Sequence, residues 1–220
     1  VKEIQISDDN FTLIRRHALG ICDEIVRRGL DVHWSCPNGL RIDRIDKELL
    51  LRMKKSGCHL IGLGIESGSP HILQNIKKDL DLSLVRKMTN IAKEVGITTV
   101  GFFILGFPGE DIIDIQQTIG FAKSLDLDRA WFNYLFLLPG SELFESYLQK
   151  NNIAALDIDT LTTIMKKVGD SHVSEKELKD FVKSAVKGFY LRPRTLLNFI
   201  RNIGPRQLVT AVKARRKYGL

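Results

Sequence analysis

Hydrophobic and polar positions along the chain form a repeating unit of a short apolar run, a polar loop and an amphipathic segment with helical spacing. The apolar runs begin roughly thirty residues apart, which is the length of a strand–helix–strand unit. Nearly continuous apolar strands that alternate with helices are typical of a parallel sheet covered by helices. We therefore predict an α/β fold with five parallel strands at residues 1–7, 31–36, 58–65, 97–105 and 129–138.

The segments between these strands predict helices because their apolar residues recur three and four positions apart. Ile14, Ala18, Ile21 and Ile25 form such a stripe in the first segment, and Asp46 is placed to cap the second. We expect a break near residues 79–81 in the third segment. We expect these helices to end at glycines, because glycine adopts the left-handed conformation readily. The glycines are Gly29, Gly57 and Gly96.

The pattern changes after residue 148. Residues 149–175 are polar and weakly periodic, which predicts a linker with short helix, and residues 176–220 predict helices. We therefore divide the chain into a strand-and-helix domain over 1–148, a linker over 149–175 and a basic helical C-terminal extension over 176–220.

Polar clusters follow the predicted strands. The loops after parallel strands share one edge of a sheet, where binding groups gather. We therefore expect Glu66 and Ser67 to face the same cavity as Asp9 and Ile104. The clusters are Asp8-Asp9-Asn10, Pro37-Asn38-Gly39, Glu66-Ser67-Gly68-Ser69, Gly106-Phe107-Pro108-Gly109-Glu110 and Pro139-Gly140-Ser141.

The residues alone leave two interpretations open for each cluster. The oxygens of 8–10 suit a cation or an ammonium group, or else an Asx turn that caps a helix. Glu66 and Ser67 offer a carboxylate and a hydroxyl for a ribose diol or an ammonium group, or else Ser69 simply caps a helix before Pro70. The run 101–106 suits either the stacking of an aromatic base or a buried strand.

Composition is that of an ordinary globular protein, with 44% hydrophobic and 27% charged residues among 220. The net charge of +7 arises late, since residues 183–220 contain ten Lys and Arg side chains and no acid. Such a stretch suits contact with nucleic acid or anionic lipid, or else a solvated basic helical face. We favour the solvated face, expect no nucleic-acid binding, and keep membrane association as the less favoured alternative.

Three cysteines, Cys22, Cys36 and Cys58, are too widely spaced for a metal-binding loop, and their odd number argues against a disulfide framework. We predict that Cys22 and Cys58 are core residues and that the chain itself supplies no metal ligand. The chain starts without an initiator Met or a signal peptide, inside a predicted strand, so we expect it to be part of a longer protein.

Together and in this order, the clusters resemble the radical S-adenosylmethionine (SAM) superfamily. The match is closest to the branch whose members usually carry a cobalamin-binding domain before the barrel. The motifs that carry the resemblance are D-D-N-F-T at 8–12, G-I-E-S-G-S at 64–69, F-I-L-G-F-P-G-E at 103–110, P-G-S at 139–141 and G-F-Y-L-R-P at 188–193.

The resemblance implies a partial TIM-type (β/α)6 barrel that binds a 4Fe-4S cluster through C-x-x-x-C-x-x-C after its first strand and cleaves SAM reductively. No such cysteine motif occurs in this sequence. We therefore expect the chain to begin at the second barrel strand, with the first strand, the cluster ligands and any cobalamin domain upstream. The chain alone would then be inactive because it cannot assemble the cluster.

The resemblance also implies roles for individual residues. Many members have G-G-E where this chain has 8–10, and the common form G-x-I-x-G-x-x-E places its acid three residues after the second glycine, whereas Glu110 comes four residues after Gly106. Arg41 would meet a carboxylate in a bidentate pair or lie at the surface. The implied SAM-binding set is Asp8, Asp9 and Asn10 for the ammonium, Glu66 and Ser67 for the ribose or methionine, and Ile104 and Gly106 for the adenine with Glu110 nearby.

We thus expect a cytoplasmic radical SAM enzyme, either a cobalamin-dependent methyltransferase or an anaerobic cyclase-like relative. We also expect a small-molecule or cofactor substrate and an electron donor such as flavodoxin or ferredoxin. One alternative is an ordinary TIM-type enzyme that uses Asp9 and Glu66 for acid–base chemistry, which requires the two carboxylates to lie close together. A second alternative is a degenerate barrel that binds SAM or a partner without catalysis.

Overall fold

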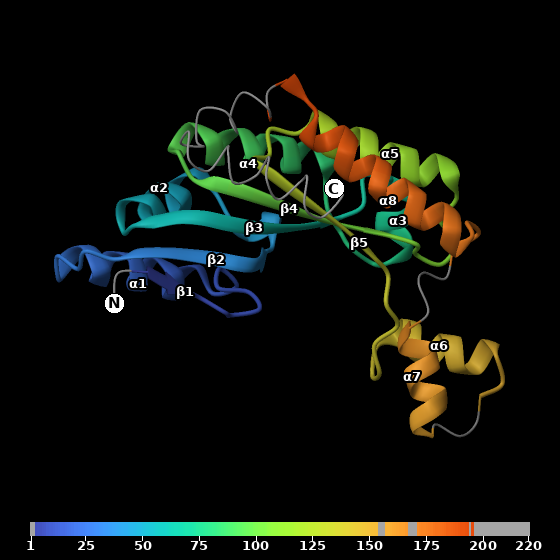
Figure 1. Ribbon diagram of the computed structural model, residues 1–220. Coiled ribbons are helices and arrows are strands. Elements are labelled where there is room, and N and C mark those ends of the chain that lie inside the picture. The colour runs from blue at the N-terminus through green and yellow to red at the C-terminus, as the bar shows by residue number, and fades with distance from the viewer. Residues whose placement is uncertain (1–2, 154–156, 167–170, 194, 196–220) are drawn as a thin grey trace, which may run out of the picture.

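The computed structural model describes residues 3–153, 157–166, 171–193 and 195. Within these residues, five strands form one parallel sheet in the order in which they occur in the chain (Figure 1). The strands are β1 (Glu3–Gln5), β2 (His33–Leu40), β3 (Cys58–Glu66), β4 (Thr98–Leu105) and β5 (Arg129–Tyr134). The helices are α1 (Arg15–Arg27), the 3-10 turn η1 (Ile42–Arg44), α2 (Lys47–Lys55), α3 (Pro70–Asn75), α4 (Leu82–Val95), α5 (Ile112–Ser124), α6 (Glu142–Lys150), α7 (Ile158–Lys166) and α8 (Glu175–Tyr190).

The main core lies between the sheet and helices α1, α2, α4 and α8. Side chains of β2 to β5 enter it, whereas those of β1 are exposed, and neighbouring residues of a strand point to opposite faces of the sheet. In β5, for example, Ala130 and Phe132 are buried while Trp131 between them is 56% exposed. The predicted α/β architecture with five parallel strands is therefore confirmed.

Helix boundaries follow the capping chemistry of the sequence. Asp46 accepts a hydrogen bond from the Leu49 amide at the start of α2, as predicted. Gly96 ends α4 in the left-handed conformation, also as predicted. The expected break near 79–81 separates α3 from α4, and Asp81 caps the latter.

The largest differences from the predicted strand boundaries are at the ends of β2 and β5. Residues 37–39 were expected to form a loop, but β2 continues through them to Leu40 after a register shift against β3. Glycines permit this close pairing, because a Cβ at Gly62 would lie 2.5 Å from the Pro37 carbonyl oxygen and Gly39 has a φ of +107°. The fifth strand is shorter than predicted and ends at Tyr134 rather than at residue 138.

Helix α8 packs against β5 and α5 (Figure 1). Its Ala185 and Phe189 belong to the main core, and the Phe189 and Phe132 rings meet edge to face. The Tyr190 hydroxyl donates a hydrogen bond to the Ala130 carbonyl oxygen. The first helix of the predicted extension thus covers the sheet, whereas residues 196–220 lie outside the described residues, and the predicted division into domain, linker and extension stays a prediction.

Helices α6 and α7 lie beyond the carboxyl end of β5, away from the rest of the helical layer (Figure 1). Their Phe144 and Ile164 join Ile72 and Phe107 in a separate apolar cluster. In the described part of the chain, no helix is long and apolar enough to cross a membrane.

Candidate binding site at the carboxyl edge of the sheet

Glu66 is the last residue of β3 and has a φ of 68°, a conformation that side-chain-bearing residues rarely adopt. The amide of Ser67 donates to the Ile65 carbonyl oxygen at 2.9 Å, which closes a tight three-residue turn around Glu66. The Glu66 carboxylate accepts a hydrogen bond from Lys78 Nζ at 2.8 Å. Both side chains are about three-quarters covered, so this ion pair is partly shielded from solvent at the sheet edge.

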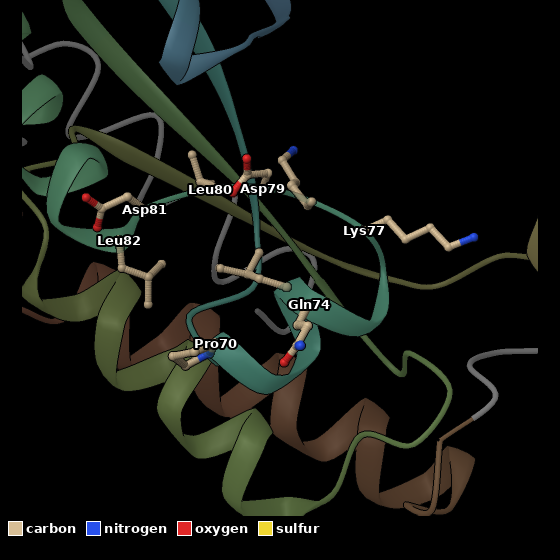
Figure 2. A pocket seen from close by; sticks show the side chains of 9 residues that line it. Pro70, Gln74, Lys77, Asp79, Leu80, Asp81 and Leu82 are labelled. Atoms are coloured by element: carbon tan, nitrogen blue, oxygen red, sulfur yellow. The ribbon is translucent and has the colours of Figure 1, made fainter.

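Two cavities flank segment 76–81, which connects α3 to α4. One cavity of about 320 Å³ is lined by Arg41, Gly64 and Lys78 together with neighbouring residues. A Cβ at Gly64 would lie 3.0 Å from Glu66 Oε1, so the glycine keeps the ion pair uncrowded. The other cavity, of about 530 Å³, lies between α3, segment 76–81 and Leu82 at the start of α4 (Figure 2).

Arg41 lines the smaller cavity, but its guanidinium is engaged in a bidentate pair with Asp43, at 3.0 and 2.9 Å. These hydrogen bonds raise the pKa of Arg41 and lower that of Asp43. The Arg41 side chain is 55% exposed and that of Asp43 is 33% exposed. Arg41 therefore lies near the candidate site with its Nε and Nη2 atoms paired to Asp43.

The Ser67 side chain contacts a different element of the fold from the one that the Glu66 side chain contacts. Its hydroxyl is fully buried and lies 2.9 Å from the hydroxyl of Thr118 on α5. The Ser67 oxygen also accepts a hydrogen bond from the Ser69 amide at 3.1 Å. The adjacent residues of the predicted pair therefore contact different surroundings, Glu66 at the sheet edge and Ser67 beneath α5.

Residues 8–10 form a turn at the end of β1. Asp8 Oδ1 accepts a hydrogen bond from the Asn10 amide at 2.7 Å, and Asn10 Oδ1 accepts one from the Thr12 hydroxyl at 3.4 Å. Asp9 is exposed. Among the described residues, no hydrogen bond or ion pair joins this turn to Glu66, whose partner is Lys78 rather than Asp9.

Glu110 is fully buried under the turn that follows β4. Its Oε2 accepts hydrogen bonds from the amides of Gly106 and Phe107, the latter at 3.2 Å. Its Oε1 is buried and has no hydrogen-bond partner in the described part of the chain. Burial raises the pKa of Glu110 to about 7, despite the opposing effect of the two amides.

Ile104 and Gly106 bracket the end of β4. Ile104 is half-buried and lies in register with Asn133 of β5. Gly106 has a φ of +99°, which begins the turn around the Glu110 carboxylate. The structure thus brings Ile104, Gly106 and Glu110 together at the end of β4, one strand away from Glu66.

The three cysteines are free and buried. Burial raises the pKa of all three thiols, that of Cys36 to about 12, so they are poor thiolate ligands. Within the described ranges, no group of three or more His, Cys, Asp or Glu side chains could hold a metal ion.

Sequence reasoning missed two residues of this site, Lys78 and Thr118. Lys78 is one of two consecutive lysines twelve positions beyond Glu66, and no motif marks it as a partner. The sequence does contain a pattern that could have indicated Thr118. Thr118 lies one helical turn after Asp114, and both are polar residues on a helix face that is otherwise apolar and buried.

Comparison with known proteins gives consistent matches. The sequence model of the Radical SAM superfamily matches residues 1–122. An uncharacterized methyltransferase of Pyrococcus horikoshii is 34% identical over 200 residues, which cover 91% of this chain and 43% of the relative. Cytidylyl-2-hydroxyethylphosphonate methyltransferase of Streptomyces wedmorensis is 32% identical over 157 residues, covering 68% of this chain and 29% of the relative.

Solved structures with the same fold have lower sequence identity to this chain than these two relatives have. The radical SAM methyltransferase TsrM of Kitasatospora setae, solved with cobalamin and a 4Fe-4S cluster, matches 71% of this chain and 32% of its own, with a TM-score of 0.63 and 18% identity. The cobalamin-dependent SAM radical enzyme OxsB matches 98% of this chain and 38% of its own, with a TM-score of 0.61 and 14% identity.

These matches confirm the resemblance inferred from the motifs, and the five-stranded parallel sheet has the fold of the radical SAM partial barrel. The chain spans less than half the length of these relatives. With the family model matching more than half of its residues, the chain belongs to the radical SAM superfamily.

Proposed function

We propose that the carboxyl edge of this sheet binds SAM, and that the protein containing the chain cleaves SAM reductively at a 4Fe-4S cluster to start radical chemistry. Family membership supports the cofactor, and the methyltransferase names of several relatives support methyl transfer as the reaction class. Other relatives are named as cyclases and methylthiotransferases, so the fold by itself does not select the substrate.

The observation that carries this proposal is the partly shielded Glu66–Lys78 pair beside the cavity of about 320 Å³. The carboxylate is a suitable acceptor for an ammonium group or a ribose hydroxyl, and the ammonium of Lys78 is a suitable donor to a carboxylate. SAM carries all of these groups. The charges present at the edge therefore complement the methionine and ribose parts of SAM.

The turn after β4 has features that suit binding of the adenine ring of SAM. Half-buried Ile104 offers apolar surface, and the backbone around Gly106 is held in place by the carboxylate of Glu110. Flat apolar surface beside fixed backbone groups suits an aromatic base. We propose that Ile104 and Gly106 flank the adenine while Glu110 shapes the turn from beneath.

The residues of this chain do not fit an iron–sulfur cluster. The cysteines are buried in the core with raised pKa values, and the described residues contain no cluster of metal-binding side chains. We propose that the cluster ligands, and a cobalamin domain if the protein uses one, lie in the part of the protein outside this chain. A small-molecule or cofactor substrate and a flavodoxin- or ferredoxin-type electron donor complete the proposal.

Equilibrium titration of SAM into the whole protein, with its cluster reconstituted, tests the assignment of Glu66. Glu66→Gln removes the negative charge but keeps the shape of the side chain. We expect SAM affinity to fall by about tenfold to a hundredfold, since a hydrogen bond to a charged group contributes about 1.5–3 kcal/mol.

Glu94→Gln is the matched control, because Glu94 is an exposed acid whose ion pair, among the described residues, is with Lys47 of the neighbouring helix. A thermal melt of each variant separates folding from binding. If Glu66→Gln lowers the melting temperature but leaves SAM affinity unchanged, Glu66 is a structural residue and the proposed site is wrong.

A further inference from the structure

The conformation of Glu66 needs support from its surroundings. A left-handed φ at a residue with a side chain is unfavourable and persists only where neighbouring contacts enforce it. The ion pair with Lys78 holds the carboxylate end of the side chain. The backbone of the same turn must be held by other groups, and those groups lie on α5.

Thr118 is the central group of this support. Its hydroxyl lies 2.9 Å from the Ser67 hydroxyl and accepts a hydrogen bond from the Gly68 amide at 3.0 Å. All of these groups are buried, so the hydrogen bonds are shielded from competition with water. One side chain of α5 therefore fixes both of the residues that follow Glu66.

Asp114 provides a second attachment one helical turn earlier on α5. Its Oδ1 accepts a hydrogen bond from the Ser69 hydroxyl at 2.5 Å. Gly68 allows the turn to approach the helix, because a Cβ there would lie 2.9 Å from Thr118 Cα. The three residues after Glu66 are thus fastened to α5 in succession.

We propose that Thr118 is a positioning residue for Glu66: its hydroxyl fastens the 67–69 turn to α5 and thereby holds Glu66 in the conformation that presents its carboxylate at the sheet edge. This inference rests on the proposed SAM-binding role of Glu66. On this proposal, residues 67–69 of the G-I-E-S-G-S motif attach the turn to α5, while Glu66 contacts the ligand.

The test compares Thr118→Val and Thr118→Ser in the whole reconstituted protein. Valine removes the hydroxyl at nearly constant volume, and we expect SAM to bind about tenfold more weakly. Serine restores the hydroxyl, and we expect affinity within about threefold of the parent. Thr89→Val is the control, because Thr89 is a fully buried threonine whose hydroxyl donates only to the Arg86 carbonyl oxygen within α4.

Two further measurements separate positioning from general destabilisation. Hydrogen exchange of the Gly68 amide should accelerate in Thr118→Val and not in Thr89→Val, because only the former loses the acceptor of that amide. In a Glu66→Gln background, Thr118→Val should change SAM affinity by less than about twofold, because the residue acts through Glu66. Thr118→Ala replaces the valine variant if the latter does not fold.

These measurements distinguish a failure of the Thr118 inference from a failure of the proposed function. If Glu66→Gln weakens SAM binding but Thr118→Val does not, the inference is overturned and the proposed function stands. An equal loss from Thr118→Val in the parent and in the Glu66→Gln background also overturns it. If Glu66→Gln alone binds SAM like the parent, the proposed function itself fails.

Discussion

Two glutamates at the ends of neighbouring strands have opposite surroundings. Glu66 is partly exposed and forms an ion pair with Lys78. Glu110 is sealed from solvent, and in the described part of the chain its carboxylate is bound by two backbone amides, both through the oxygen Oε2. The first arrangement suits contact with a charged ligand, whereas the second suits support of a loop.

This difference predicts how stability depends on pH. Because burial raises the pKa of Glu110 from 4.5 to about 7, folding favours its neutral form. The associated stability is complete below about pH 4.5 and is lost as the pH rises through about 7. We expect Glu110→Gln, which does not ionise, to gain about 2–3 kcal/mol relative to the parent between pH 5 and pH 8.

Urea unfolding of the parent and of Glu110→Gln at the two pH values measures this gain. Glu94→Gln is again a suitable control, since Glu94 is exposed. Parallel pH profiles for the parent and Glu110→Gln would mean that Glu110 is ionised in the folded protein throughout this range.

At the scale of elements, α5 is the helix that organises the site. Its N-terminus is closed by a capping box between Asp111 and Asp114, and the same Asp114 bonds Ser69 and His71 of the neighbouring segment. Burial disfavours the ionised form of Asp114, but these hydrogen bonds outweigh burial and hold its pKa below the usual value. Helix α5 therefore links the ends of β3 and β4 through buried hydrogen bonds.

Two glycines test how closely the turn packs on α5. A Cβ at Gly68 would lie 2.5 Å from the Phe121 Cβ, so we expect Gly68→Ala to destabilise the protein by about 1–3 kcal/mol through overpacking. Gly120 on α5 has nothing within 4 Å of its would-be Cβ, and we expect Gly120→Ala to stabilise by about 0.5–1 kcal/mol. Urea unfolding of both variants compares them, and equal effects would contradict the close packing at Gly68.

Much of this element structure was predictable because it depends on local chemistry. Asp46 and Gly96 mark helix ends by side-chain capping and by glycine conformation, and both act as predicted. The extension of β2 through 37–39 was not predictable, because it depends on a partner strand whose Gly62 has no side chain in the way. A Pro-Asn-Gly sequence signals a turn unless tertiary pairing overrides it.

The positions of the candidate residues in the fold were predictable, whereas their contacts were less so. The ordered motifs placed Glu66, Ile104 and Glu110 at the ends of neighbouring parallel strands, where they lie. The partners of Glu66 and Ser67 come from segments twelve and fifty-one positions away, which are Lys78 and Thr118. Such contacts depend on how helices pack over the sheet, which motif spacing does not specify.

At the scale of the whole molecule, α8 completes the helical layer over β5. The guanidinium of Arg192, just after α8, donates to the carbonyl oxygens of Lys123, Leu125 and Leu127 and lies 3.6 Å from the centre of the Phe189 ring. These bonds join the end of α8 to the connection between α5 and β5. The residues after the α6–α7 pair therefore help to fix the last strand of the sheet.

The central claim is that the carboxyl edge of this sheet, with Glu66 at its centre, binds SAM. A crystal structure of the whole protein with its cluster and SAM tests this claim most directly. We predict a SAM nitrogen or ribose oxygen within about 3 Å of a Glu66 carboxylate oxygen, with the adenine against Ile104 and Gly106. SAM bound elsewhere, with the Glu66–Lys78 pair unchanged and no ligand atom in contact with it, would contradict the account.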